Sequence, residues 1–296
     1  MNLQIDLKTR LIKILIYTVL IIFCIVCIIP FLLLVSISFS DEVAISRFGY
    51  SLIPLKFTTY AYQYILVYPD VIANAYVVSI LVTVLGTAMS LTVTAMAAYA
   101  LSRSSLKYKN HISFYIFFTM LFNGGMVSWY IVTSQLLHLR ENIFALIVPY
   151  LANAWYIMIM RNFFKSSVPE ALIESVKIEG GGEFRAFWQV ALPVSLPGLA
   201  TVALFTTLAY WNDWYLGLML ITANQKIVPL QLYMHRIMST LQYLQSDPQA
   251  LNRGITVPGE SARMAVCVLA IGPIIFVYPF FQKYFVKGLT VGSVKG

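Results

Sequence analysis

The sequence predicts an all-α membrane protein with six transmembrane helices and one long polar loop on the cytoplasmic side. Of its 296 residues, 59% are hydrophobic and 11% are charged, whereas about a quarter of the residues in a soluble domain carry charge. Six apolar runs are long enough to cross a bilayer, which takes about 20 helical residues. They lie at about 11–39, 71–101, 112–134, 142–161, 196–221 and 262–285, and we expect residues 1–296 to form a single membrane domain.

The first two runs differ in what they offer for packing. The first is longer than the core of a cleaved signal peptide and lacks a small-residue cleavage site, so we expect it to remain as a span. It carries Cys24 and Cys27, which have no His or carboxylate beside them; we interpret them as packing residues and expect no metal site. The second run is rich in small and hydroxyl residues that let helices approach closely: Ser79, Thr83, Gly86, Ser90 and Thr94.

Two later runs contain polar interruptions. The third is broken by Asn123-Gly124-Gly125, and backbone groups freed at membrane depth are tolerated only where protein or a water-filled cavity covers them. The fifth carries Asp213, whose charge costs about 2.5 kcal/mol or more at the bilayer centre. Asp213 therefore faces a cavity or a partner, unless it lies near enough to the outer surface to be an interfacial residue.

The basic residues predict the orientation of the chain. If the N-terminus is cytoplasmic, the inner segments hold 13 of the 20 Lys and Arg residues, as the positive-inside rule requires. Both termini, the 102–111 loop and the 166–193 loop then face the cytoplasm. The net charge of +8 is spread over these four membrane-flanking segments, so we do not expect nucleic-acid binding.

The polar loop 166–193 predicts a helix that ends at glycine. Ser167 stands three residues before Glu170, which is the spacing of a capping box, and Pro169 suits a first helical turn. Gly180-Gly181-Gly182 ends the helix, since glycine enters left-handed conformations without strain. Two faces follow from the helical period: an apolar or small one of Val168, Ala171, Leu172, Ser175 and Val176, and a polar one of Glu170, Glu174 and Lys177. Lys177 is the base nearest to Glu174 within the helix.

A second short helix is predicted after the glycines. Phe184, Phe187 and Trp188 lie on one side of it, and Leu192-Pro193 is expected to stop it. The loop as a whole is a helix, a glycine elbow and a helix, with more acidic residues on its surface than basic ones to pair with them.

This loop resembles the EAA loop of binding-protein-dependent ABC importer permeases, which reads Glu-Ala-Ala, three residues, Gly, nine residues, Ile-x-Leu-Pro. Glu174, Gly180, Leu192 and Pro193 are in register with that pattern, while Ser-Val replaces Ala-Ala and Val190 replaces Ile. The resemblance implies that the loop is the coupling helix, which contacts a cytoplasmic ATPase. The residues implied in that contact are Glu170, Glu174, Lys177, Glu179, Gly180, Leu192 and Pro193. The alternative is an amphipathic hairpin lying in the lipid interface.

Three more stretches resemble the subgroup of this family that imports oligosaccharides and related carbohydrates, some of them acidic such as alginate. They are LFNGGMVSWYIV around Asn123, MRNFF at Met160–Phe164, and the ending FVKGLTVGSVKG. The resemblance implies the type I ABC importer permease fold in a bacterial cytoplasmic (inner) membrane. It also implies four partners besides lipid: a second, more often heterologous, permease, an ABC ATPase dimer, an extracytoplasmic solute-binding protein and a carbohydrate.

The substrate pathway is assigned from the polar residues within the apolar runs, and the binding-protein contact from the same resemblance. For the pathway we expect Asn123, Asn153, Trp211, Asn212 and Asp213, whose aromatic neighbours could stack on sugar rings or anchor a helix end. The long outer loop 222–261 is expected to face the solute-binding protein, with Asn252-Arg253-Gly254 at its tip. Lone His235 in this loop is interpreted as a surface histidine.

The absence of several sequence motifs argues against other classes of function. The sequence has no Gly-x-x-x-x-Gly-Lys-Ser/Thr phosphate loop, so we expect ATP and Mg to be bound by the partner ATPase and no cofactor to be bound by this chain. It has no nucleophile–base set, so a membrane-embedded enzyme is disfavoured. The alternative of a stand-alone secondary sugar transporter is opposed by the absence of inverted repeats and by the acidic loop.

Overall fold

The computed structural model describes residues 2–246, 259–277, 279 and 281, and these are almost entirely helical. Among them the only β-pairing is an isolated bridge between Ser40 and Phe57. The chain divides into two compact units. The first comprises Met1–Pro69 and Arg236–Gly272, and the second Asp70–His235 and Pro273–Gly296.

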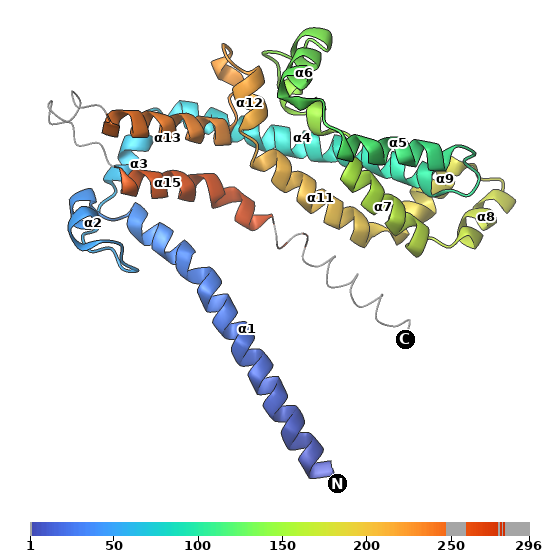
Figure 1. Ribbon diagram of the computed structural model, residues 1–296, viewed down its shortest axis with the longest axis horizontal. Coiled ribbons are helices and arrows are strands. Elements are labelled where there is room, and N and C mark those ends of the chain that lie inside the picture. The colour runs from blue at the N-terminus through green and yellow to red at the C-terminus, as the bar shows by residue number, and fades with distance from the viewer. Residues whose placement is uncertain (1, 247–258, 278, 280, 282–296) are drawn as a thin grey trace. The chain divides into compact units, whose positions relative to one another are not determined.

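The first unit is organised around the contacts of its last helix. It contains α1 (Asn2–Ser38), α2 (Glu42–Phe48), α3 (Tyr60–Ile65) and α15 (Glu260–Ile271), and α15 contacts the other three. Glu42 of α2 accepts hydrogen bonds from the backbone N–H groups of Glu260 and Ser261, at 2.9 and 3.0 Å, and so caps α15. Most of α1 extends away from these contacts (Figure 1), and its side chains from Thr9 to Leu32 are exposed. Cys24 and Cys27 are therefore exposed and do not pack against the described residues of this chain.

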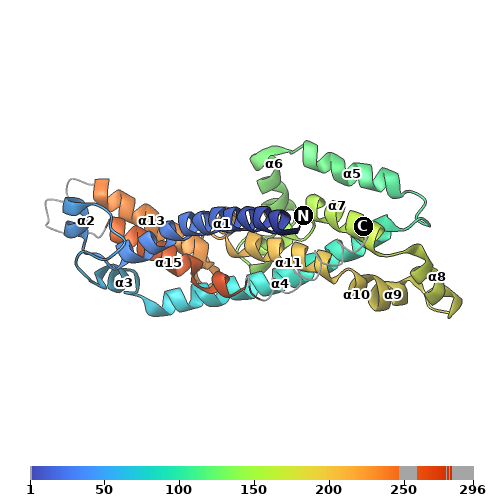
Figure 2. The same ribbon diagram turned by 90° about the horizontal axis from the view of Figure 1, so that it is seen from below.

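The second unit is built on α4 (Pro69–Ser102) and α11 (Leu196–Trp211). The other elements on it are α5 (Lys109–Leu121), α6 (Gly125–Ile131), η1 (Val132–Leu136), η2 (Ile143–Leu146), η3 (Val148–Tyr150), α7 (Ala154–Ser167), α8 (Glu170–Ile178), α9 (Glu183–Ala186), η4 (Phe187–Ala191), α10 (Leu192–Val194), α12 (Tyr215–Leu220) and η5 (Gln225–Ile227). Helix α13 (Leu230–Ser246) has its first residues in this unit and the rest, from Arg236, in the first unit. In η6 (Gly272–Phe276), Gly272 belongs to the first unit and the residues from Pro273 belong to the second. Figures 1 and 2 show α8 and α9 at the end of the unit where α4 finishes, away from α6 and α12.

Small residues on α4 let this unit pack tightly, as predicted. Ser79, Thr83, Gly86, Ser90 and Thr94 are all buried. A Cβ at Gly86 would lie 2.6 Å from Cζ of Tyr210, whose hydroxyl donates a 2.9 Å hydrogen bond to the Ile147 carbonyl. The aromatic ring of α11 thus lies directly on the backbone of α4.

Two helices are long and apolar enough to cross a membrane, Thr9–Ser38 and Pro69–Ser102, and both match predicted spans. Three helix pairs pass the same test only when joined across a bend. They are Lys109–Leu121 with Gly125–Leu136 (117°), Ile143–Tyr150 with Ala154–Ser167 (50°), and Glu183–Val194 with Leu196–Trp211 (81°). By length and composition the described residues thus hold two to five candidate spans.

One predicted span is corrected by the structure, and another is described only in part. The predicted run 196–221 is not one helix: α11 ends at Trp211, and α12 begins at Tyr215 after a break at the polar pair Asn212-Asp213. The predicted run 262–285 is helical in α15 and η6, and its remainder lies largely outside the described residues. The break predicted at Asn123 is confirmed, because α5 ends at Leu121 and α6 begins at Gly125.

Candidate functional site

The predicted coupling loop is a helical hairpin whose first arm is α8. Its N-cap is Pro169, with no side-chain cap, and Ser167 is the last residue of α7. The predicted capping box is therefore wrong, because α7 extends through Ser167. The predicted apolar face is also partly wrong: Val168 and Val176 are buried, but Leu172 is 42% exposed and Ile173 is buried instead. The helical register starts at Glu170, which places Ile173 and Val176 on the inner side.

The glycine elbow forms as predicted. Gly180 has a φ of +79°, in the left-handed region where glycine is favoured. The N–H of Gly181 donates to the Val176 carbonyl at 2.8 Å, and that of Gly180 to the Lys177 carbonyl at 3.0 Å. These two bonds make a Schellman motif, which satisfies the last carbonyls of α8 and turns the chain back.

The second arm runs through α9, η4 and α10 without a stop at Leu192-Pro193. The helical segment continues to Val194, and the chain bends by 81° only at Ser195, so the predicted stop is two residues early. Pro193 follows the wide π turn η4, which accommodates a residue that lacks an N–H. Phe187 is buried, whereas Phe184 and Trp188 are 70% and 51% exposed.

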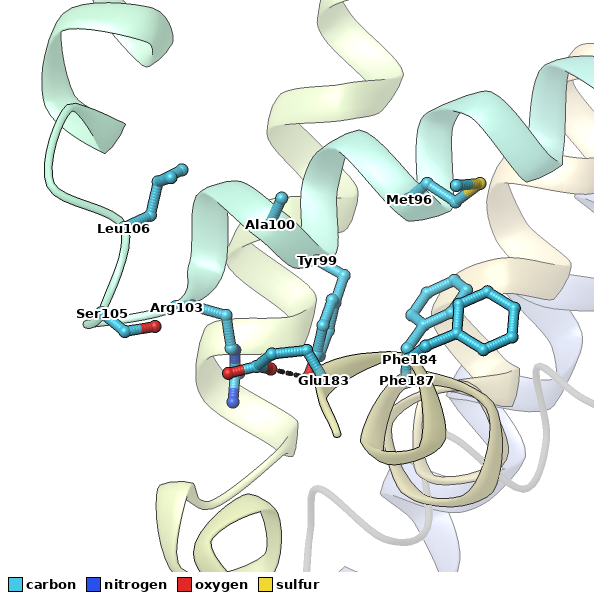
Figure 3. A pocket seen from close by; sticks show the side chains of 9 residues that line it. All are labelled: Met96, Tyr99, Ala100, Arg103, Ser105, Leu106, Glu183, Phe184 and Phe187. Carbon is cyan, nitrogen blue, oxygen red and sulfur yellow. Dashed lines mark hydrogen bonds between the residues drawn. The ribbon is translucent and has the colours of Figure 1, made fainter. Parts of the chain in front are cut away.

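One carboxylate connects the two arms to α4. Lys177 Nζ of α8 lies 2.6 Å from Oε1 of Glu183. The Tyr99 hydroxyl of α4 donates a 2.8 Å hydrogen bond to Oε2 of the same residue, as Figure 3 shows. Although Lys177 is the base nearest to Glu174 within the helix, it pairs with Glu183 across the turn. A pocket of about 360 Å³ opens beside Tyr99, lined by Met96, Tyr99, Ala100, Arg103, Ser105, Leu106, Glu183, Phe184 and Phe187.

The outer surface of α8 is left acidic by this pairing. Glu170, Glu174 and Glu179 are exposed, and no described basic side chain forms an ion pair with any of them. Glu170 accepts a hydrogen bond from the Ser104 hydroxyl of the loop after α4. The arrangement presents three carboxylates that a basic surface of another protein could pair with.

A second candidate site lies at the break of the third apolar run. A pocket of about 310 Å³ is lined by Asn123, Gly125, Met126, Trp129, Pro149, Tyr150, Tyr215 and Leu216. Asn123 Oδ1 accepts from the Gly125 N–H at 2.8 Å, and Gly125 has a φ of +80°. The freed backbone at the break thus borders a cavity, as expected for irregular backbone at membrane depth.

Asp213 stands behind this pocket. Its Oδ1 accepts a 3.0 Å hydrogen bond from the Tyr150 hydroxyl, and its Oδ2 accepts one from the Leu216 N–H at 3.1 Å. Asp213 therefore holds Tyr150 in place and caps the first turn of α12. It faces described protein partners that satisfy both oxygens.

The other predicted pathway residues have local contacts outside this pocket. Asn153 caps α7 by accepting from the N–H groups of Trp155 and Tyr156, at 3.0 and 3.3 Å. Trp211 is 4% exposed, and the Asn212 amide donates to the Leu208 carbonyl at 2.9 Å. The predicted tip residues Asn252, Arg253 and Gly254 lie outside the described residues.

Of the three aromatic residues that line this pocket, Trp129 and Tyr150 were not predicted, whereas Tyr215 is one of the aromatic neighbours of Asp213 that were expected to stack on a sugar or anchor a helix end. Trp129 and Tyr215 each follow a break within a few residues, so an aromatic residue just after a polar break is the pattern that could have indicated them. Tyr150 has no such pattern, because it enters through the 3₁₀ turn η3.

Two residues at the predicted outer side, Glu141 and His235, make specific contacts. Glu141, whose φ is 57°, accepts hydrogen bonds from the Thr222 hydroxyl and from the N–H groups of Thr222, Ala223 and Asn224. The Thr222 hydroxyl, with those N–H groups, lowers the pKa of Glu141 from its ordinary 4.5 to about 2. His235 stacks on Trp214 with ring centroids 4.4 Å apart, so it is half-buried rather than a free surface histidine.

Comparison with known proteins gives close relatives over the whole chain. No family model matches it. It is 37% identical over 290 residues to "Polygalacturonan/rhamnogalacturonan transport system permease protein YtcP" of Bacillus subtilis (strain 168), covering 98% of this chain and 100% of that protein. It is 28% identical over 303 residues to "Maltodextrin transport system permease protein MalD" of Streptococcus pneumoniae (strain ATCC BAA-255 / R6), covering 100% of both.

A solved structure has the same fold. It is the crystal structure of a bacterial ABC transporter involved in the import of the acidic polysaccharide alginate. One of its chains matches with a TM-score of 0.78 and 30% identity, over 94% of this chain and 98% of that one.

Proposed function

The chain belongs to the permease subunits of ABC transporters, and we propose that it carries an oligo- or polysaccharide inward across a bacterial inner membrane. The observation that carries this proposal is the 37% identity, over the full length, to a permease named for polygalacturonan and rhamnogalacturonan transport. The likeness to a chain of an alginate importer supports a saccharide, and both named substrates are acidic. Because ABC permeases leave ATP hydrolysis to a partner subunit, this chain is not an enzyme, and we propose that the partner also binds ATP and Mg.

The α8 hairpin is the proposed contact with that ATPase. Glu170, Glu174 and Glu179 offer exposed negative charge on one helix, which a basic cleft on the ATPase would complement. Gly180 lets the two arms fold back so that both enter one cleft. Lys177 has a different part in this proposal, because it pairs with Glu183 and so holds the arms together.

The proposed topology has six spans with both termini in the cytoplasm. The pair α5 with α6 and η1 is one span, η2 and η3 with α7 a second, and α11 with α12 a third; α1 and α4 are two more, and α15 begins the sixth. The exposed apolar length of α1 is then covered by lipid or by a second, heterologous permease. The outer loop after α12 would meet the solute-binding protein, and an ATPase dimer would drive the spans between inward- and outward-open states.

Uptake by proteoliposomes tests the function. The complex of both permeases and the ATPase, with its binding protein outside, should accumulate oligogalacturonate, oligoalginate or maltodextrin when ATP is supplied inside. A proton or sodium gradient without ATP should give no uptake. Uptake driven by the ion gradient alone would contradict the proposal and favour a stand-alone secondary transporter, for which no comparison gives support.

A further inference from the structure

We propose that the pocket at the break between α5 and α6 is a subsite for one pyranose ring of the transported saccharide. Trp129 and Tyr215 would contact the apolar face of the ring, and Asn123 and Tyr150 would contact its hydroxyl edge. The inference rests on the proposed transport of a saccharide. It adds a binding site within this chain, together with the part of the sugar that the site recognises.

The two aromatic residues form the wall of the pocket. The ring centroids of Trp129 and Tyr215 are 5.8 Å apart, with planes inclined by 36°, and both side chains are half-buried. Trp129 comes from α6, just after the break in the third apolar run, and Tyr215 from α12, just after the break in the fifth. The C–H face of a pyranose is apolar, and large, rigid aromatic surfaces supply contact area to such a face.

The polar groups beside this wall are complementary to a hydroxyl. Asn123 Oδ1 is occupied by the Gly125 N–H, and no described residue accepts from Asn123 Nδ2, which leaves a donor. The Tyr150 hydroxyl donates to Asp213, which leaves its oxygen as an acceptor. One donor and one acceptor on the same rim suit a sugar hydroxyl, which can both donate and accept.

The charge of the residues in and behind the pocket determines which edge of a sugar it binds. None of its lining residues is basic, and the Asp213 carboxylate lies 3.0 Å behind the Tyr150 hydroxyl. A uronate carboxylate would be repelled there, so an acidic saccharide would turn its carboxylate away from this rim. The volume of about 310 Å³ is at the lower end for ligand pockets, so the site holds a short part of an oligomer.

The test compares Trp129→Ala and the milder Trp129→Phe with Trp155→Ala, a change of an exposed tryptophan on α7 that does not line the pocket. Each variant complex is first shown to assemble by gel filtration. Uptake and ATP hydrolysis are then measured with whichever of oligogalacturonate, oligoalginate and maltodextrin the parent transports best. We expect Trp129→Ala to lower sugar transported per ATP by about tenfold, Trp129→Phe to lower it less, and Trp155→Ala to match the parent.

A direct binding measurement completes the test. Titrating the detergent-solubilised complex with the same sugar should quench tryptophan fluorescence in the parent, and the quench should shrink in Trp129→Phe. Equal transport and equal quenching in parent and Trp129 variants would overturn the subsite while leaving the transport function intact. Failure of the parent to transport any of the three sugars would count against the proposed function instead, and with it against the subsite.

Discussion

The hydroxyl of Tyr99, near the end of α4, donates a 2.8 Å hydrogen bond to Glu183 at the start of α9. The other oxygen of Glu183 pairs with Lys177 on α8 at 2.6 Å. A single carboxylate thus joins a long apolar helix to both arms of the hairpin. Arg103 lies over the ring of Tyr99, with its guanidinium carbon 4.9 Å from the ring centroid, and is almost fully buried. A displacement of α8 by a bound ATPase would therefore be passed to α4 through this contact.

The Tyr99–Glu183 contact should matter for coupling more than for assembly. Tyr99→Phe removes the hydroxyl donor and Glu183→Gln removes the charge that Lys177 pairs with. Each should lower transport per ATP at least about threefold, because a hydrogen bond to a charged group contributes about 1.5–3 kcal/mol. A double-mutant cycle should show a combined effect smaller than the sum. Additive effects would mean that the two residues act separately. The matched control is Tyr115→Phe, which removes the hydroxyl of an exposed tyrosine on α5.

Exchanging the charges of the ion pair gives an independent check. Lys177→Glu alone places two carboxylates together across the glycine turn and should reduce coupling. Adding Glu183→Lys should restore part of it, since the attraction returns with opposite polarity. No recovery in the double variant would show that the side chains are needed for something other than their mutual attraction.

Glu174 should contribute to binding of the ATPase. Glu174 is exposed and has no described basic partner, so Glu174→Lys reverses a free charge without breaking an internal pair. We expect binding of the ATPase to the permease to weaken by about tenfold or more, if a charge-assisted contact of about 1.5–3 kcal/mol is lost. The measurement is the amount of ATPase that co-purifies with the permease. Full co-purification would instead favour a hairpin that lies in the lipid interface.

Gly180 and Gly182 offer a matched pair of substitutions in the elbow. Gly180 has a φ of +79°, whereas Gly182 has a φ of −85° and open space within 4 Å of where a Cβ would lie. Gly180→Val should strain the turn by about 1–2 kcal/mol and abolish ATP-coupled uptake, with membrane insertion intact. Gly182→Ala should be nearly silent. Similar loss in both variants would mean that the elbow does not depend on the left-handed conformation.

The sequence predicted this elbow because the need for glycine is local to Gly180. It did not predict the partner of Lys177, because Glu183 comes within reach only after the chain has turned back. The same limit applies to the fifth apolar run. Apolar residues on both sides of Asn212-Asp213 read as one span, and the break forms because Asp213 accepts from Tyr150 and from the start of α12. Paired glycines predicted the break near Asn123. The aromatic wall beside it was not predictable, because Trp129 and Tyr215 follow two different breaks that come together only in the folded chain.

Asp213 should act by positioning Tyr150 and α12. Asp213→Asn keeps one acceptor for the Tyr150 hydroxyl but removes an acceptor and the charge at the start of α12. We expect transport to fall several-fold while the complex still assembles, because each lost charged hydrogen bond weakens the fold around the pocket. Asn212→Ala, which removes only an amide bonded to its own helix, is the control. Uptake by Asp213→Asn equal to that of the parent at limiting sugar would assign Asp213 to the membrane interface.

Glu141 makes the loop between η1 and η2 sensitive to acid. Its folded pKa of about 2 lies below the ordinary 4.5, chiefly because the Thr222 hydroxyl bonds the ionised carboxylate, with the N–H groups of Ala223 and Asn224 adding to this. The stabilisation is therefore fully present above about pH 4.5 and is lost as the pH falls toward 2. Glu141→Gln should lower the Tm of the detergent-solubilised protein at pH 7, and the difference from the parent should shrink between pH 4.5 and 3. A difference that stays constant over that range would show that the carboxylate charge does not hold Thr222–Asn224 in place.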